Sequence, residues 1–503
     1  MKKPTVPLSF CRLKRLLAGF ALFLSATAIP SGQTSFPPQP WRYLLLHDSY
    51  LLDDCLICGR PTIIEAMRGA FDLQVIEQNT LFTRYALENI DFTAGERPYL
   101  VHGSGTLEIG GEVAVTVRVF LQAEINDGFT NKLGYFTNAT QTLDRTWPMM
   151  DLTLVQTNGT PGQTYTLRLA AAPIREIWFS TAKSFYSLAL NKTVFEGDLL
   201  SSSGRIVKSN EELYLLIGGM CCISDVGLDA FDVLPGGELA LSIRQWFYSE
   251  EIGAIGPGDL VGCQIGTGIK RTIAHNHDLV AAFVPDPPPS DVGLDAVHVL
   301  IGEIWFSTPS NFVSRFPRFP MHRGDLLSNK GIIIRSNQQL LSRFHPVNAT
   351  NDYGLDALYI WPNGELWFST QDDLEDQSLG LIHHGDLLSD QGYIAFRSDQ
   401  LTKAFRPGLT NAPPDVGLDA LYLITDATPP EPAPRFVVAG TFSIKPLPGE
   451  LIWRAGGRVF QVERAERVMG PFVPISPIIP DLFFTDPMAR TNRSQGYYRL
   501  GQW

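Results

Sequence analysis

The chain has 503 residues, of which 44% are hydrophobic and 18% are charged, and this is the composition of a packed globular protein. Its length predicts about three domains. The formal net charge of −12 argues against nucleic-acid binding, because an acidic protein repels phosphate backbones and no basic patch interleaved with aromatics offsets that charge.

Residues 1–28 have the pattern of a secretory signal peptide. Five basic residues flank the start of an apolar run over 16–24, and Ala26-Thr27-Ala28 offers a small-residue cleavage site. The run is too short to span a bilayer, and no later stretch is long enough. Cleavage would leave 35 Lys and Arg against 52 Asp and Glu, a net charge of −17. We therefore expect a secreted, periplasmic or cell-surface protein without a transmembrane segment.

Residues 41–172 predict an N-terminal β-sandwich-like domain. Apolar stretches with the two-residue alternation of strands recur at 106–109, 114–123 and 164–170, and Gly and Asn punctuate them.

Five cysteines remain after the signal peptide is removed. Cys55 and Cys58 have the spacing of a redox or zinc half-site, but no second ligand pair stands at zinc-finger spacing and the surrounding pattern is not βαβ. A small loop closed by a disulfide is the favoured interpretation. Cys221 paired with Cys222 or Cys263 gives further disulfide candidates, and the odd count leaves at least one thiol free or paired between chains.

Residues 174–425 contain four copies of one unit of about 60 residues. Asp-x-Gly-Leu-Asp-Ala recurs at 225–230, 291–296, 352–357 and 415–420. Glu-Ile/Leu-Trp-Phe-Ser-Thr recurs at 176–181, 303–308 and 365–370, and Gly-Asp-Leu-Leu at 197–200, 324–327 and 385–388. Each copy predicts two hairpins and a short helix, and a repeated four-stranded unit is typical of a propeller blade.

The two ends of the repeated region complement each other. The first copy begins at Ile174 without the Gly-Leu-Asp-Ala strand, and the last ends at Ile424 without the Glu-Leu-Trp strand. Together they make one complete unit, which predicts a closed four-bladed β-propeller without an exposed edge. A larger ring that uses part of the N-terminal region is the alternative.

The second copy departs from the pattern of its siblings. Ala240 replaces the tryptophan that stands at Trp178, Trp305 and Trp367 in the other copies, and Trp246 is expected to fill the space.

The C-terminal part begins with a proline-rich linker over 427–435, and short apolar runs over 436–503 predict a small sandwich. Trp453, Val459–Arg464 and Tyr497–Leu500 carry a pattern that resembles the fibronectin-III-like module of many exported bacterial proteins. The repeats resemble those of uncharacterised secreted bacterial proteins built from Phe-Ser-Thr, Gly-Asp and Leu-Asp-Ala units. The resemblance implies an all-β, extracellular protein and carries no established activity.

One aspartate of each copy opens the strand expected nearest the ring axis. Four equivalent carboxylates could converge there and repel one another, which predicts a cation site with calcium as the candidate ion. The structural alternative is that short acidic side chains before turns accept backbone N–H bonds. The candidate ligands are Asp229, Asp295, Asp356 and Asp419.

Three other motifs have structural explanations. Asn276 in His275-Asn276-His277 aligns with helix-capping positions in the other copies, which argues against a nuclease motif. Arg323 precedes the Gly-Asp turn that all copies share, so Arg-Gly-Asp is incidental. His383 and His384 are adjacent, and adjacent residues on a strand face opposite ways, which argues against a shared metal.

No nucleophile elbow, phosphate loop or zinc-binding helix motif occurs in the sequence. We therefore expect a non-catalytic binding or surface-interaction protein for an extracellular carbohydrate or protein. The alternatives are an exported hydrolase or lyase and a purely structural protein. A pocket with clustered carboxylates on a face of the ring would favour the enzyme, and a flat face without them would favour binding.

Overall fold

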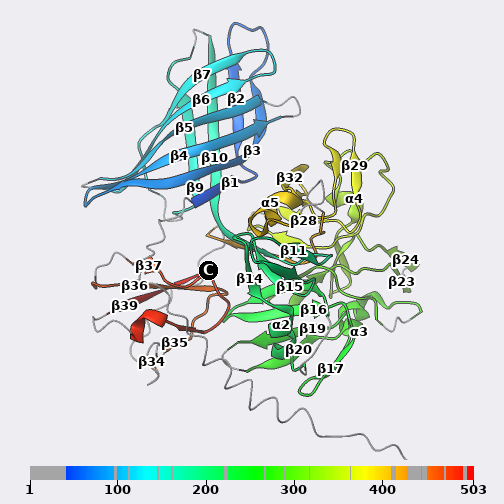
Figure 1. Cartoon of the computed structure of the whole chain (residues 1–503). Helices are drawn as coiled ribbons and strands as arrows, with labels where there is room; N and C mark the ends of the chain where they lie inside the picture. The colour runs from blue at the N-terminus through cyan, green and yellow to red at the C-terminus, as the bar shows by residue number, and fades with distance from the viewer. Residues whose placement is uncertain are drawn as a thin grey trace, which may run out of the picture. The chain divides into compact units, whose positions relative to one another are not determined.

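The computed structural model describes residues 41–503 with gaps (Figure 1), so the expected signal peptide and the linker over 427–435 lie outside the described residues. The fold is all-β, as the sequence predicts. No helix among the described residues is long and apolar enough to cross a membrane. The gaps are 96–98, 112–113, 144–146, 160–161, 220–224, 266–267, 288–290, 316–317, 363, 409–414, 427–442, 445–449, 469–471 and 491–495.

Eight antiparallel strands of the N-terminal region pair in a closed cycle, in which β10 returns to β1 (Figure 1). In pairing order they are β1 (Trp41–Leu45), β3 (Ile63–Gln78), β4 (Phe82–Ala94), β5 (Tyr99–Gly110), β6 (Thr116–Asn126), β7 (Asn131–Asn138), β9 (Met150–Gln156) and β10 (Gln163–Phe179). Strand β2 (Tyr50–Cys55) pairs with β3 and β10, and β8 (Gln141–Thr142) pairs with β6.

This closed cycle differs from the expected pair of packed sheets. The alternating burial of β6 shows that one side of each strand faces a single core, which includes Tyr43, Phe71 and Phe92. Strand β3 carries two bulges against β4, and Gly69 at φ +134° lies so close to the Asp91 carbonyl that no side chain fits. Bulges and close backbone approaches bend long strands, and this bending lets one sheet close on itself.

Four groups of four antiparallel strands with one strand order occupy the described part of 174–425, and we call them repeat sheets 1 to 4. Repeat sheets 2 to 4 are separate sheets, whereas repeat sheet 1 is continuous with the N-terminal strands through β10. Sheet 1 contains β33 (Leu421–Thr425), the end of β10, β13 (Leu199–Ser201) and β14 (Arg205–Lys208). Sheet 2 contains β15 (Leu228–Leu234), β16 (Glu238–Ile243), β19 (Leu260–Gln264) and β20 (Lys270–Ala274). Sheet 3 contains β21 (Val297–Leu300), β22 (Glu303–Phe306), β25 (Leu326–Ser328) and β26 (Ile332–Arg335). Sheet 4 contains β27 (Leu358–Ile360), β28 (Leu366–Phe368), β31 (Leu387–Ser389) and β32 (Tyr393–Phe396).

Each copy also contains a short helix, as expected, and a two-stranded hairpin that the sequence analysis missed. The hairpins are β11 (Phe185–Ser187) with β12 (Lys192–Val194), β17 (Phe247–Ser249) with β18 (Gly253–Ile255), β23 (Phe312–Arg315) with β24 (Arg318–Met321), and β29 (Leu374–Asp376) with β30 (Gly380–Ile382). The helices are α2 (Asn210–Leu216), α3 (Asn276–Val280) with η1 (Ala281–Phe283), α4 (Asn337–Leu340), and α5 (Ser398–Thr402) with η2 (Lys403–Phe405).

The two ends of the repeated region pair with each other, as their complementary truncation predicts. Strand β33 lies antiparallel to β10, with Tyr422 opposite Trp178 and Leu421 opposite Phe179. The first strands β15, β21, β27 and β33 contact one another in a closed order.

One repeated hydrogen bond links each copy to the next. The serine of Phe-Ser-Thr, or its counterpart in the second copy, donates to the leucine carbonyl of the next Gly-Leu-Asp-Ala, and the fourth bond returns to the first sheet. The bonds are Ser180 Oγ to Leu228 O (2.8 Å), Ser242 to Leu294 (3.1 Å), Ser307 to Leu355 (2.6 Å) and Ser369 to Leu418 (2.8 Å). These buried bonds explain why the two motifs recur together.

The second copy replaces a polar contact that the other copies share. Trp178 Nε1 donates to Glu176 at 2.9 Å, and Ser201 Oγ donates to the same carboxylate at 2.9 Å. In sheet 2, Ala240 stands at the tryptophan position and lies opposite Gly262, which stands at the serine position. Both hydrogen-bond donors to the glutamate are therefore replaced together. Trp246 is 63% exposed, so the expectation that it fills the space is wrong.

The C-terminal region forms two three-stranded sheets, with η3 (Pro487–Arg490) after the last strand of the first sheet. Trp453 and Phe460 are buried in their shared core. This arrangement agrees with the expected small sandwich, while the fibronectin-III resemblance stays a prediction. The sheets are β34 (Ser443–Ile444), β35 (Glu450–Ile452) and β38 (Phe483–Thr485), and β37 (Val473–Pro474), β36 (Phe460–Ala465) and β39 (Tyr497–Gln502).

Candidate functional site: a polar pocket between the repeat sheets

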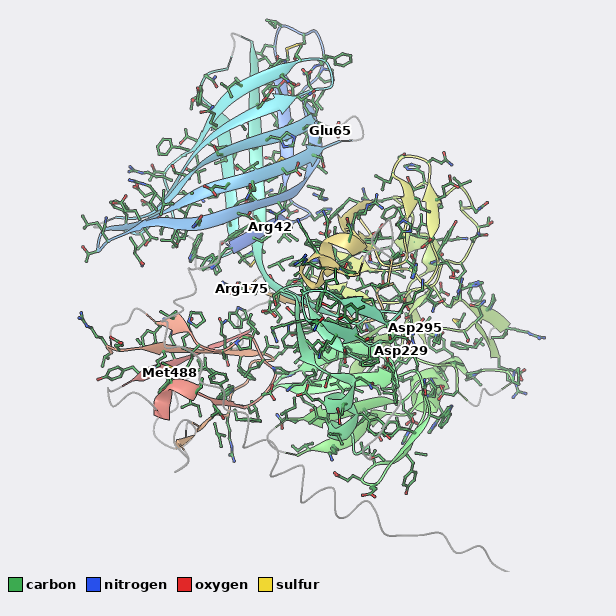
Figure 2. All side chains as sticks on the ribbon, viewed as in Figure 1. Arg42, Glu65, Arg175, Asp229, Asp295 and Met488 are labelled. Atoms are coloured by element: carbon green, nitrogen blue, oxygen red, sulfur yellow. A yellow bond between two sulfur atoms is a disulfide. The ribbon has the colours of Figure 1, made fainter. Side chains whose placement is uncertain are left out.

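A pocket of about 730 Å³ opens between the four repeat sheets, and we call it the axial pocket. Each of the four repeat sheets contributes at least one charged or amide side chain to its wall. Figure 2 labels two of these residues, Asp229 and Asp295, within the repeat region. The polar groups at its centre are Asp229, Asp295, Asp356, Asp419, Arg244 and Gln371.

The structure brings together the four aspartates that the sequence singles out. Each stands two residues after a glycine whose φ is positive, between +70° and +80°, a conformation that glycine adopts without strain. The turn at that glycine directs the next strand into the centre of the repeat region. All four aspartates are buried, with at most 7% of each residue exposed.

The position directly after Phe-Ser-Thr differs in every copy and lines the same pocket. Two of these residues, Ala182 and Pro309, cannot make side-chain hydrogen bonds, and the other two are Arg244 and Gln371. Arg244 donates from Nε to Asp229 at 2.9 Å and from Nη2 to Asp419. The second copy therefore supplies a guanidinium that neutralises carboxylates from two different sheets.

Gln371 holds a third aspartate. Its Nε2 donates to Asp295, and its Oε1 accepts from Arg323 Nη1 at 2.9 Å. Arg323 also forms an ion pair with Asp372. Arg323 thus supports the wall of the pocket, which agrees with the interpretation that the Arg-Gly-Asp tripeptide is incidental.

Burial shifts the protonation equilibria of the four aspartates. It raises the pKa of Asp229 to about 7, with a further rise from the charge of Asp419 and an opposing effect of Arg244. Burial raises the pKa of Asp419 to about 6, against lowering by Arg244 and by a hydrogen bond with Asp356. Burial and neighbouring carboxylates raise the pKa of Asp295 and Asp356 well above the ordinary value of 3.8. The cluster therefore holds protons at neutral pH.

These contacts bear on the calcium hypothesis. The four candidate ligands converge as expected, but the guanidinium of Arg244 supplies positive charge between two of them, and Gln371 bonds a third. Calcium binding stays a prediction. The sequence analysis missed Arg244 and Gln371; aligning the copies shows only that the residue after Phe-Ser-Thr varies, not that it meets the aspartates.

The aspartates of Gly-Asp-Leu-Leu have a structural role. In the second copy, Asp259 Oδ1 accepts from the backbone N–H of Asn276 at 2.9 Å, and Asn276 Oδ1 accepts from Val292 N–H at 3.0 Å. These bonds tie the short helix to the next copy. The N-cap residue is His275, which makes no side-chain capping bond, so the expected capping role of Asn276 is wrong.

His384 and Asp373 line the axial pocket, and His383 and Asp415 lie beside them. His383 and His384 occupy the turn between β30 and β31, so the alternation of strand residues does not apply, and both imidazoles approach Asp373. Hydrogen bonding to Asp415 raises the pKa of His384, against the effect of burial. Burial acts to raise the pKa of Asp415, but the hydrogen bond and charge of His384 lower it to about 2. The premise that the two histidines lie on a strand is therefore wrong, and the expectation against a shared metal stays a prediction.

The cysteines lie away from the axial pocket where the structure describes them. A disulfide joins Cys55, the last residue of β2, to Cys58, with a Cα separation of 5.4 Å. Cys263 is a buried free thiol, and burial raises its pKa to about 12, which makes it unreactive. Cys221 and Cys222 lie outside the described residues.

No protein-family model matches the chain, and a search of curated proteins finds no match. The function is therefore argued from the axial pocket.

Proposed function

We propose that residues 174–425 form a four-bladed β-propeller within a secreted, non-catalytic binding protein. The four equivalent sheets and the cyclic serine bonds support the propeller. The expected signal peptide supports export, and the repeat and C-terminal motifs support kinship with secreted bacterial proteins of this build.

The axial pocket receives an amine-bearing, hydroxyl-rich group, such as a sugar unit of an oligosaccharide with free amino groups. The observation on which this rests is the convergence of four buried aspartates on one pocket, where the guanidinium of Arg244 bonds two of them. Lys183 and His384 also line the pocket. Carboxylates, an amide and a guanidinium make directional hydrogen bonds to hydroxyls, and unneutralised carboxyls favour a cationic group. A phosphate or carboxylate ligand would meet like charge.

Protonation links this proposal to pH. The raised pKa values of Asp229 and Asp419 mean that these carboxyls carry protons at pH 6 to 7. An ammonium group in the pocket lowers the pKa of nearby carboxyls, so binding releases these protons. For each proton that binding releases, the affinity should rise roughly tenfold per pH unit over this range.

Calorimetry with glucosamine oligomers, their N-acetylated counterparts and an oligouronate tests the proposal. We expect the glucosamine oligomers to bind best, and Gln371→Ala, which removes the amide that lines the pocket, to weaken that binding. Asp399→Asn, at an exposed helix position outside the pocket, is the matched control. Equal binding of the oligouronate, or no effect of Gln371→Ala, would contradict the proposal.

An exported hydrolase is the second candidate, because clustered carboxylates in a pocket are the feature that it requires. Arg244 donates to Asp419, so this carboxylate is paired and is not free to act as nucleophile or acid. Arg244 further engages Asp229. If the protein cleaves these oligosaccharides and Asp419→Asn abolishes the cleavage, the hydrolase replaces the binding protein as the proposed function.

A further inference from the structure

Four potential metal ligands converge at the turn between β30 and β31. His384 Nδ1 lies 2.8 Å from Asp415 Oδ2 and 3.0 Å from Asp373 Oδ1. His383 Nδ1 lies 3.4 Å from Asp373 Oδ2 and 3.8 Å from Asp415 Oδ2. The ligand atoms of Asp373, His384 and Asp415 all lie within 4.8 Å of one another.

Two of the three side chains around Asp415, those of His384 and Asp373, are particular to the fourth copy. The third, His383, has a counterpart in His322 of the third copy, whose Nδ1 lies 3.9 Å from Asp352 Oδ2. The positions of His384 and Asp373 are occupied in the other copies by Glu196, Pro257 and Arg323, and by Ser184, Trp246 and Asn311. Residues that recur in every copy serve the common fold, whereas residues that depart together at one point indicate a local site.

Asp415 itself is common to the copies, but its contacts are not. Its counterpart Asp225 uses Oδ2 to accept the backbone N–H of Glu196 at 2.7 Å. In the fourth copy, Asp415 keeps the Oδ1 bond to Gly417 N–H at 3.1 Å, while its buried Oδ2 faces the imidazole nitrogens. The carboxylate oxygen that caps a turn in the first copy is thus directed at nitrogen donors in the fourth.

We propose that His384, Asp415, Asp373 and His383 bind a divalent transition-metal ion of the zinc class. Imidazole and carboxylate are the ligands that such ions accept, with bonds of about 2.0–2.2 Å. A tetrahedron with those bonds has edges of about 3.3–3.6 Å, and the separations of 2.8–3.8 Å span this range. Calcium fits poorly because it requires six to eight oxygen ligands.

The burial of the cluster suits a site that an ion can reach. The side chains of His384 and Asp415 are 16% and 17% exposed, whereas those of His383 and Asp373 are 43% and 45% exposed. The inner pair is held in place by packing, and the outer pair leaves a route from solvent.

One neighbouring charge opposes metal binding. Lys183 Nζ lies 3.5 Å from His384 Nε2, on the side of the ring away from the cluster. Lys183 is exposed, so its side chain can turn into solvent when the ion arrives. Its ammonium repels a divalent ion, so removing it should tighten the site.

Calorimetry of the full chain with Zn²⁺ after chelator treatment tests this proposal, which does not depend on the amino-sugar ligand. We expect about one ion per chain and at least tenfold weaker binding in His384→Asn and in Asp373→Asn. Lys183→Met should bind severalfold more tightly. His277→Asn removes a member of the other exposed histidine pair, which stacks with His275, and should leave affinity unchanged.

Circular dichroism spectra of each variant separate a lost site from a lost fold, and the absorption of bound Co²⁺ gives a second readout that His384→Asn should abolish. An absence of zinc binding, or binding that only His277→Asn removes, would overturn the proposal. Zinc binding without glucosamine binding would support this site and contradict only the proposed function.

Discussion

Replacing Arg244 with methionine tests whether one guanidinium holds the centre of the repeat region together. The methionine keeps most of the aliphatic stem but removes the charge that Asp229 and Asp419 face, and their side chains are only 8% and 1% exposed. Removing one partner of a buried ion pair costs about 3–5 kcal/mol, because the remaining charge is left without compensation. We expect a loss of this size at pH 8.

The loss should be much smaller at pH 5. Both carboxyls have a pKa above the ordinary value of 3.8, about 7 for Asp229 and about 6 for Asp419. The folded state therefore binds these protons more readily than the unfolded state, and this stabilising contribution is full below about pH 4 and is lost as the pH rises through 7. Protonated carboxyls need no guanidinium, so acid should rescue the Arg244→Met variant to within about 2 kcal/mol of wild type.

Thermal unfolding followed by circular dichroism at pH 5 and pH 8 measures this effect. A loss of 3–5 kcal/mol corresponds to a drop in Tm of roughly 6–20 °C for a region of this size. The triple variant Arg244→Met, Asp229→Asn, Asp419→Asn should recover most of the stability at pH 8, because neither carboxyl that the guanidinium compensated remains. Equal losses at both pH values, or a triple variant no better than the single one, would refute the reasoning.

Two further predictions concern closure and packing. Leu423→Pro removes a backbone donor from β33, opposite Ile177 of β10, and should destabilise the repeat region by at least about 3 kcal/mol and open it to limited proteolysis; Leu381→Pro, in a peripheral hairpin, should cost less. Trp367→Ala should cost about 3–5 kcal/mol in denaturant unfolding, whereas Trp246→Ala, at a position 63% exposed, should change stability by under about 0.5 kcal/mol. Equal effects of the two proline variants, or of the two alanine variants, would show that closure or burial is not what these residues provide.

The strand content and the pairing of β33 with β10 could be predicted from the sequence. The first follows from the local pattern of apolar residues, and the second from the points at which the first and last copies of the repeat are cut. A motif repeated at a fixed period must form the same element each time, and a strand missing at one end must be supplied by the other. The same reasoning placed Asp229, Asp295, Asp356 and Asp419 together. The closed cycle of the N-terminal strands could not be predicted in this way, because it depends on bends at positions such as Gly69 whose effect appears only after pairing.

The partners of those aspartates were decided by tertiary structure alone. Arg244 meets Asp419 across 175 positions of sequence, and His384 meets Asp415 because a turn, not a strand, carries the histidine. Side chains from different copies come within hydrogen-bonding distance only when the sheets are arranged in space, and periodicity contains no information on which unlike residues then face each other. The sequence determined the repeated scaffold, and three-dimensional packing determined which charges meet within it.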